Sequence, residues 1–310
     1  MAELILHHYP SSPFSEKVRL VLGFKGMAWR SVIVPAIMPK PDVLTLTGGY
    51  RRTPFMQIGA DIYCDSALMC RAIDALQPEP PLYPSAAAGL ADIVAQWADS
   101  TLFWAAVPYT MQPAGINHVL KGATPDMLKA FGVDRAAMNP SLRRPTVADG
   151  AVAVRTYWAR LEHLLGDGRP FLLGALPCIA DFSAAQSVWF MRLAPPVATM
   201  LDAFPKLTGW FARVAAYGPG TFTKMTSMEA IAVAVAAQGR HAPLAFAPEA
   251  GLAQGDAVTV TPTDYAHDAV GGNLIGLSAD EVVIERTDER AGTLHVHFPR
   301  IAFQIKLLTP

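Results

Sequence analysis

The most informative part of the sequence is YPSSPFSEKVRLVL, at residues 9–22. It follows the apolar run Leu4–His7, which is typical of a buried strand. Ser12 and Pro13 are typical of a helix N-cap and a first helical position, and Gly26 ends the apolar stripe that follows. The stretch therefore predicts a strand-to-helix turn, where free backbone N–H groups and the positive end of a helix dipole meet.

The hydroxyl groups of this turn have a spacing with chemical meaning. Ser12-x-x-Ser15 is the spacing of a CxxC redox motif in which both sulfur atoms are replaced by oxygen. The chain therefore cannot form its own mixed disulfide there, and a ligand would have to supply the thiol. A helix N-terminus and a hydroxyl donor both stabilise a thiolate. Taken without further context, the turn favours the simpler interpretation, in which Ser12 only caps the helix.

Strand and helix signals alternate through the first eighty residues. We interpret residues 35–49 as a loop, because they hold three prolines and end in two glycines. The other segments predict the order β-α-β, loop, β-β-α, with a strand at Trp29–Val34, a hairpin of Phe55–Ile58 and Asp61–Cys64, and a helix at Ala67–Leu76.

The pattern changes twice after the proline-rich linker at residues 78–84. Apolar residues then recur at helical spacing, with short helices and loops expected at 112–149, and helices expected at 152–165, 181–193, 204–217 and 227–238. From residue 241 the pattern becomes that of strands, with Gly271-Gly272 interpreted as a turn. We expect an α/β domain at 1–80, an all-helical domain at 85–238, and a separate all-β module at 241–310, folded as a small roll or open barrel.

Composition excludes several classes of protein. The 310 residues include 25 Lys and Arg against 26 Asp and Glu, so no global field draws the chain to nucleic acid or to an anionic membrane. No apolar run reaches the roughly 18 residues that a membrane span needs, and the N-terminus has no secretion signal. Charged residues are only 16% of the chain, which indicates a large core or an apolar face covered by a second subunit.

Cysteine and histidine give no sign of a metal site. Cys64, Cys70 and Cys178 form no CxxC pair, so we expect neither a disulfide scaffold nor structural zinc, and a cytoplasmic location. His295 and His297 share one strand face, but no further ligand is spaced to complete a site.

Three motifs together resemble the glutathione transferase family. Residues 9–26 resemble its opening segment, Thr53-Pro54-Phe55-Met56 resembles its cis-proline segment, and Asp65-Ser66 resembles its pair of an acidic residue and a serine. The resemblance is close over residues 4–76, weaker to about residue 225, and does not reach the C-terminal module. It implies a thioredoxin-like α/β domain followed by an all-helical domain, with glutathione bound on the first.

The resemblance also implies roles for single residues. Ser12 would donate a hydrogen bond to the glutathione sulfur, beside Phe14, and the Thr53 backbone, held by a cis Pro54, would pair with the cysteinyl backbone. Asp65 and Ser66 would hold the γ-glutamyl end. Arg52 lies where some classes of the family keep a basic residue for the glycyl carboxylate.

Several alternatives stay open. Tyr9 or Ser11 could supply the activating hydroxyl in place of Ser12, although only Ser12 combines the helix N-terminus with the Ser-Pro-Phe spacing. Phe14, Trp104 and Tyr109 are candidates for the wall of an electrophile pocket. Pro177-Cys178-Ile179-Ala180-Asp181 resembles the family's capping box with a cysteine in the cap position, and we expect Cys178 to be buried and inert.

The resulting hypothesis is a homodimeric glutathione transferase. It would conjugate glutathione to small hydrophobic electrophiles and could also reduce peroxides. One alternative is a non-catalytic module that binds glutathione or a protein partner. Another is a cis-trans isomerase of the zeta class, which the double serine Ser11-Ser12 resembles, although that class has a cysteine where this chain has Phe14.

Overall fold

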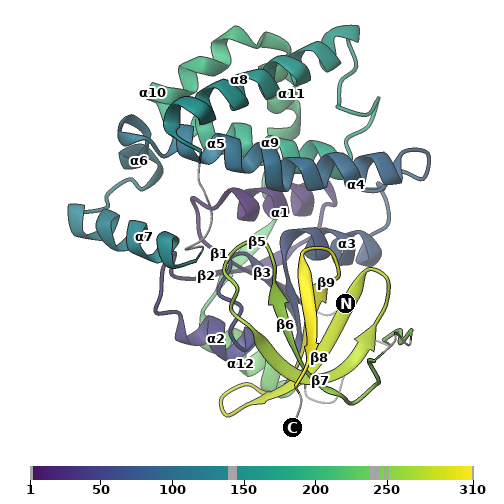
Figure 1. Ribbon diagram of the computed structural model, residues 1–310. Helices are drawn as coiled ribbons and strands as arrows, with labels where there is room; N and C mark the ends of the chain where they lie inside the picture. The colour runs from purple at the N-terminus through teal and green to yellow at the C-terminus, as the bar shows by residue number, and fades with distance from the viewer. Residues whose placement is uncertain (1–2, 139–144, 238–243, 248, 250, 309–310) are drawn as a thin grey trace.

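The computed structural model describes residues 3–138, 145–237, 244–247, 249 and 251–308. In Figure 1 most helices of the middle of the chain gather on one side, the C-terminal strands lie on the opposite side, and the N-terminal segment lies between them. One apolar core joins the three parts, from Leu6 in the first strand through Phe182 to Phe298 near the C-terminus.

The N-terminal segment has a thioredoxin-like order of elements. β1 pairs in parallel with β2 and antiparallel with β3, and β3 pairs antiparallel with β4. The elements are β1 (Leu4–His8), α1 (Pro13–Phe24), β2 (Trp29–Ile33), α2 (Pro41–Thr47), β3 (Phe55–Ile58), β4 (Asp61–Cys64) and α3 (Ser66–Leu76). The predicted strand-to-helix turn and hairpin are both present.

One prediction about this segment is wrong, because residues 35–49 are not all loop. Seven of them form α2, which starts with Pro41 in its first turn and ends at Gly48, whose φ is 76°. Proline suits the first helical position because its missing N–H would be unpaired there, and glycine suits the left-handed residue that ends a helix. The residues interpreted as helix breakers thus mark the two ends of a helix.

The middle of the chain is helical, as predicted. Its long elements are α4 (Ala88–Trp97), α5 (Phe103–Thr110), α6 (Pro113–Val119), α7 (Pro125–Ala137), α8 (Val147–Leu164), α9 (Ile179–Arg192), α11 (Pro205–Ala215) and α12 (Ser227–Ala236). Shorter turns are η1 (Ala98–Leu102), η2 (Leu165–Asp167), α10 (Pro195–Ala198) and η3 (Thr199–Ala203). A strand that we did not predict, β5 (Phe222–Met225), pairs in parallel with β2.

The central helix α9 supports the start of α1. Almost every residue of α9 is buried, and the helix packs against both α1 and α4. Asp181 holds its N-terminus by accepting hydrogen bonds from the backbone N–H groups of Cys178 at 2.9 Å and Leu172 at 2.8 Å. Cys178 is buried as expected, and burial raises the pKa of its thiol to about 12, so it is not a nucleophile at neutral pH.

The C-terminal strands do not stand apart from the N-terminal sheet. They are β6 (Ala257–Pro262), β7 (Val270–Leu277), β8 (Glu281–Asp288), β9 (Gly292–Pro299) and β10 (Phe303–Leu307). β9 pairs in parallel with β4, so within the described residues the order is β10-β6-β7-β8-β9-β4-β3-β1-β2-β5 in one sheet. The C-terminal strand module, residues 257–307, therefore extends the N-terminal sheet.

Gly271 and Gly272 lie within β7 rather than in a turn. A Cβ atom on Gly272 would lie 2.6 Å from the carbonyl oxygen of Glu285 on β8, so the close pairing of the two strands requires glycine at this position. The two glycines that were interpreted as a turn thus lie inside a strand, and Gly272 allows that strand to pack closely against β8.

Candidate functional site

Two adjoining cavities lie where the three parts of the chain meet. The first has a volume of about 250 Å³ and the second about 320 Å³. Four residues line both cavities, namely Phe14, Arg52, Thr53 and Tyr265. A ligand that occupies both cavities would therefore pass these four side chains.

The second cavity contains the turn between β1 and α1. Ser12 is the N-cap of α1, and its Oγ accepts a hydrogen bond from the Ser15 backbone N–H at 3.2 Å. Its hydroxyl proton is not used in that bond, so it can be donated to an anion in the cavity. Tyr9 and Ser11 line the same cavity, so all three candidate hydroxyl residues lie together.

The segment that holds Thr53 lies between the two cavities. The Thr53–Pro54 peptide bond is cis, as the resemblance to the family implies. The Nζ atom of Lys40 donates to Thr53 Oγ1 and to the Arg51 carbonyl, both at 3.1 Å. Sequence analysis did not select Lys40, because it directly precedes α2, which was interpreted as loop.

Lys40 differs from the other buried lysines in its partners. Lys17 and Lys25 each form an ion pair, with Asp99 and Asp74, whereas Lys40 has no ion-pair partner among the described residues. Burial, together with the positive charge of Arg135 and Arg51, lowers the pKa of Lys40 to about 8. A buried ammonium group among other cations is costly unless an anion joins it, so this position suits the carboxylate of a ligand.

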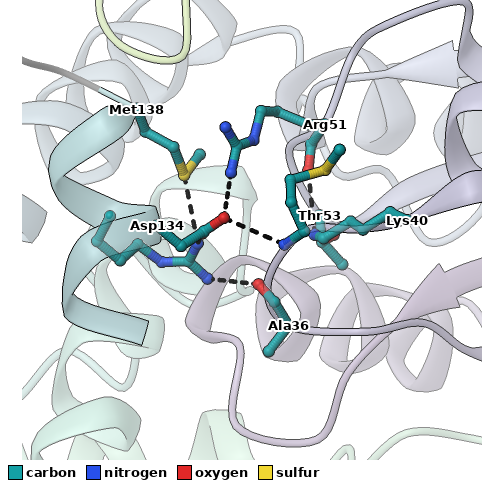
Figure 2. Close-up of polar contacts among 8 residues, drawn as sticks. Ala36, Lys40, Arg51, Thr53, Asp134 and Met138 are labelled. Carbon is teal, nitrogen blue, oxygen red and sulfur yellow. Dashed lines mark hydrogen bonds and ion pairs between the residues drawn. The ribbon is translucent and has the colours of Figure 1, made fainter. Parts of the chain in front are cut away.

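Figure 2 shows the basic side chains around Lys40. Asp134 of α7 pairs with both Arg51 and Arg135, and its Oδ1 also accepts from the Met38 backbone N–H at 3.1 Å. One carboxylate therefore serves two guanidinium groups. Among the described residues, the second cavity is lined by no acidic side chain and by four basic ones, namely Lys40, Arg51, Arg52 and Arg135.

The first cavity has the opposite balance of charge. Asp65 caps α3 by accepting from the Ala67 N–H at 2.9 Å, and the next residue, Ser66, lies 3.5 Å from the Nζ of the buried Lys17. The cavity is lined by five acidic residues, Asp65, Asp92, Asp99, Asp264 and Asp280, and by three basic residues, Lys17, Arg52 and Arg71. It therefore suits the ammonium group of a ligand, with the N-terminus of α3 available for a neighbouring carboxylate.

Arg52 lies at the boundary of the two cavities and already interacts with other residues of the chain. Its guanidinium group pairs with Asp264 and donates to the Tyr265 carbonyl, and the Tyr265 ring lies over it with 3.9 Å between the guanidinium carbon and the ring centre. Both partners come from the loop between β6 and β7. Sequence analysis did not select Tyr265, because nothing local in the C-terminal module indicates contact with the first eighty residues.

The aromatic residues expected around an electrophile are only partly brought together. Phe14 and Trp104 line the second cavity, and Phe103 packs on Phe14 with 4.7 Å between ring centres. Tyr109 lines neither cavity and instead packs against the apolar core. The remaining wall of the second cavity is largely aliphatic and aromatic, which suits an apolar molecule.

The described residues show neither a metal-binding group nor a membrane-spanning helix. No group of three or more His, Cys, Asp or Glu side chains is placed to hold a metal ion in that part of the chain. Within the same residues, no helix combines the length and apolar character that crossing a membrane requires.

Comparisons with known proteins agree with this architecture. Residues 6–81 match the family "Glutathione S-transferase, N-terminal domain", and residues 143–213 match "Glutathione S-transferase, C-terminal domain". A comparison with curated proteins finds no match.

Solved structures extend the similarity to the whole chain. A GST-like protein from Pseudomonas syringae is 40% identical, with a TM-score of 0.82, and the match covers 99% of this chain and 100% of that one. A glutathione S-transferase from Rhodospirillum rubrum F11 is 20% identical over 69% of this chain and 88% of its own, with a TM-score of 0.53. The beta-etherase LigF from Sphingobium has 16% identity, a TM-score of 0.52, and coverage of 69% and 95%. The last two share the fold alone.

Proposed function

The chain belongs to the glutathione S-transferase family, and from this membership we propose that it activates the thiol of glutathione and conjugates it to small hydrophobic electrophiles. The observation that carries the proposal is the charge difference between the two adjoining cavities. The first is rich in carboxylates, whereas the described lining of the second contains basic residues and no carboxylate. Glutathione is a zwitterion of matching form, with an ammonium group near one end and a carboxylate at the other.

The proposed pose follows from these charges. The γ-glutamyl ammonium group faces Asp65, while its carboxylate faces Ser66 and the N-terminus of α3. The cysteinyl backbone pairs with the backbone of Thr53. The glycyl carboxylate binds Lys40, which lacks an ion-pair partner in the described chain. Arg52 is less suited to this role, because its two terminal nitrogens already donate to Asp264 and to the Tyr265 carbonyl.

The proposed chemistry depends on the charge of the sulfur. A free thiol has a pKa of about 8.5, so only a few per cent is thiolate at neutral pH. A hydrogen bond from Ser12 Oγ and the dipole of α1 would lower the pKa of the bound thiol by about one to two units, which makes the thiolate the main form. The thiolate then attacks an electrophilic carbon in the second cavity, and the leaving group departs with the displaced electron pair.

The same thiolate supports peroxide reduction as a second activity. It would attack the peroxide oxygen to give a sulfenic acid and an alcohol, and a second glutathione would then form the disulfide and water. The second cavity offers an apolar wall for an organic peroxide, including Phe14, Trp104 and Val107.

The direct test is to measure binding and turnover separately. We expect calorimetry to detect glutathione binding, and we expect turnover with at least one member of a panel of aryl halides, epoxides and organic peroxides. Lys40→Met should weaken binding by about tenfold or more, because it removes the ammonium group that faces the glycyl carboxylate. Lys129→Met, an exposed lysine on α7, is the matched control.

The outcomes separate the alternatives. Binding without turnover of any electrophile would indicate a non-catalytic glutathione-binding protein. Turnover only of a cis-configured diketo acid would indicate an isomerase. The absence of glutathione binding would contradict the proposal altogether.

A further inference from the structure

The loop between β6 and β7 leaves the C-terminal module and reaches the centre of the candidate site. We name it the strap, residues 263–269. It contacts both other parts of the chain. Asp264 and Tyr265 hold Arg52 of the N-terminal segment, the Tyr265 ring meets Trp104 of α5 edge to face with 5.5 Å between ring centres, and the Ala266 N–H donates to the Met138 carbonyl at 2.5 Å.

The contacts of the strap are built into the fold. Ala266 is buried and has a φ of 48°, a left-handed conformation that a residue with a Cβ rarely adopts without support from its surroundings. Arg52 is only 5% exposed and is covered by Tyr265 on one side. A charge buried in this way needs its partners, so Asp264, although 43% of its own side chain is exposed, anchors the strap to Arg52.

Tyr265 places the strap directly at the two cavities. Tyr265 lines both cavities, beside Thr53, and both cavities stay open with volumes of about 250 and 320 Å³. The strap therefore divides the space and does not fill it. A molecule with one end in each cavity would therefore pass the Tyr265 ring and Thr53, which line both cavities.

We propose that Tyr265 is a co-substrate-binding residue, supplied by the C-terminal module, which covers the cysteinyl part of glutathione and shields its thiolate from water. This inference rests on the proposed function, because it takes the glutathione pose given there. The aromatic ring supplies apolar contact at the junction, and Asp264 with Arg52 holds the ring in place. Exclusion of water strengthens the hydrogen bond and the dipole that act on the sulfur.

Four variants test the proposal by calorimetric titration of the full-length protein with glutathione. Tyr265→Ala should weaken binding by about tenfold, the loss typical of removing one aromatic anchor. Tyr265→Phe keeps the ring and should restore the affinity. Asp264→Asn should give an intermediate loss because the strap is less firmly anchored. Asp268→Asn changes an exposed residue of the same strap that lines neither cavity, and is the matched control.

A second measurement uses the unaltered protein, so it does not depend on the folding of any variant. Bound glutathione should slow amide hydrogen exchange in residues 263–269, since the strap would be held against the ligand. A structural role alone would not make exchange in the strap depend on glutathione. Unchanged exchange at saturating glutathione would overturn the proposal.

The results distinguish failure of this inference from failure of the proposed function. If the unaltered protein does not bind glutathione, both are wrong. If it binds, but Tyr265→Ala binds equally well, the glutathione site stands and the role of Tyr265 is wrong. If Tyr265→Ala binds more tightly, the strap obstructs the site instead of completing it, and the proposal is likewise overturned.

Discussion

Ser12 combines two properties that the neighbouring hydroxyl groups do not share. It caps α1, so its Oγ lies at the positive end of the helix dipole, and it lines the second cavity. Tyr9 and Ser11 line the cavity but do not cap the helix. A thiolate beside Ser12 would therefore gain both a hydrogen bond and the field of the helix.

We expect Ser12→Ala to lower the rate of conjugation by at least about 100-fold, the loss typical of removing one hydrogen-bond donor to a developing anion. The pKa of the bound thiol should rise towards that of free glutathione, and titration of the thiolate absorbance would measure it. The variant should also lose about 1 kcal/mol of stability, since the helix loses its cap.

Ser11→Ala is the control for this measurement, because Ser11 lines the same cavity without capping α1. An unchanged rate and thiol pKa in Ser12→Ala would transfer the activating role to Tyr9 or Ser11. Tyr9→Phe and Ser11→Ala would then show which of the two carries it.

At the scale of residues, the site residues that could be predicted from the sequence are those marked by short motifs. Ser12 at the helix start follows from its own motif, and the cis Thr53–Pro54 bond was implied by the resemblance to the family. Lys40 and Tyr265 could not be found in this way. The role of Lys40 depends on its having no ion-pair partner of its own among the described residues, since the nearby Asp134 pairs with Arg51 and Arg135. The role of Tyr265 depends on a contact with Arg52 across more than two hundred residues.

At the scale of elements, the junction of β4 and β9 holds a buried cluster of charges. Asp61 Oδ1 on β4 lies 3.2 Å from His295 Nδ1 and 3.2 Å from His297 Nε2 on β9. His297 Nδ1 lies 2.7 Å from Glu281 on β8, and the Tyr63 ring stacks on His297 with 4.3 Å between ring centres. The two histidines considered as metal ligands instead join the module to the first domain.

This cluster makes the junction sensitive to pH. Burial opposes the charging of His297, but hydrogen bonds to Asp61 and Glu281 outweigh it and raise the pKa of His297 above 6.5. Its contribution to stability is therefore fully present below pH 6.5 and is lost as the pH rises through the raised value. The hydrogen bonds from both histidines hold the pKa of Asp61 below 3.8 despite burial, so its contribution is lost only in acid.

We expect His297→Gln to lower the free energy of unfolding by about 3 kcal/mol near pH 6, the cost of leaving a buried charge without its partner. The deficit should shrink as the pH rises through the raised pKa of His297, because the unaltered imidazole then becomes neutral as well. Denaturant unfolding at a series of pH values measures both effects.

His163→Gln, at an exposed position on α8, is the control for this variant. A deficit for His297→Gln that stays constant across the pH range would contradict the ionic account of the junction and leave only a packing role for His297.

The elements that sequence analysis missed share a physical cause. In α2 the proline and glycine residues mark the ends of the helix rather than a loop, and in β7 the glycines permit close strand pairing rather than a turn. Proline and glycine are compatible with a loop or turn and also with a helix end or a closely packed strand. Which of these forms depends on the neighbouring elements, which the local sequence does not specify. The joining of β9 to β4 is a tertiary contact and has no local signal at all.

At the scale of the whole molecule, the charged fraction of 16% favours association with a second copy. β9 covers the edge of β4, so a second copy cannot extend the sheet there. Two apolar residues on α4, Leu90 and Ile93, are 53% and 67% exposed and lie one helical turn apart. We propose that this face of α4 contributes to the contact in a homodimer.

Sedimentation should therefore give twice the mass of one chain, and Ile93→Asp should shift the equilibrium to the monomer, because it places a charge in an apolar contact. Leu176→Asp, at a residue that is 68% exposed in a loop, is the control. A single-chain mass at every concentration of the unaltered protein would rule out the homodimer.

The parallel pairing of residues 61–63 with 295–297 also has a consequence for biosynthesis. The ribosome completes the thioredoxin-like strands long before it reaches β9, so β4 emerges as an open edge with unpaired backbone groups. It stays open until β9 (Gly292–Pro299) has been synthesised. Termination before residue 265 would thus release a chain that has an open strand edge prone to aggregation and that also lacks Tyr265, so the cell would gain from degrading such incomplete copies.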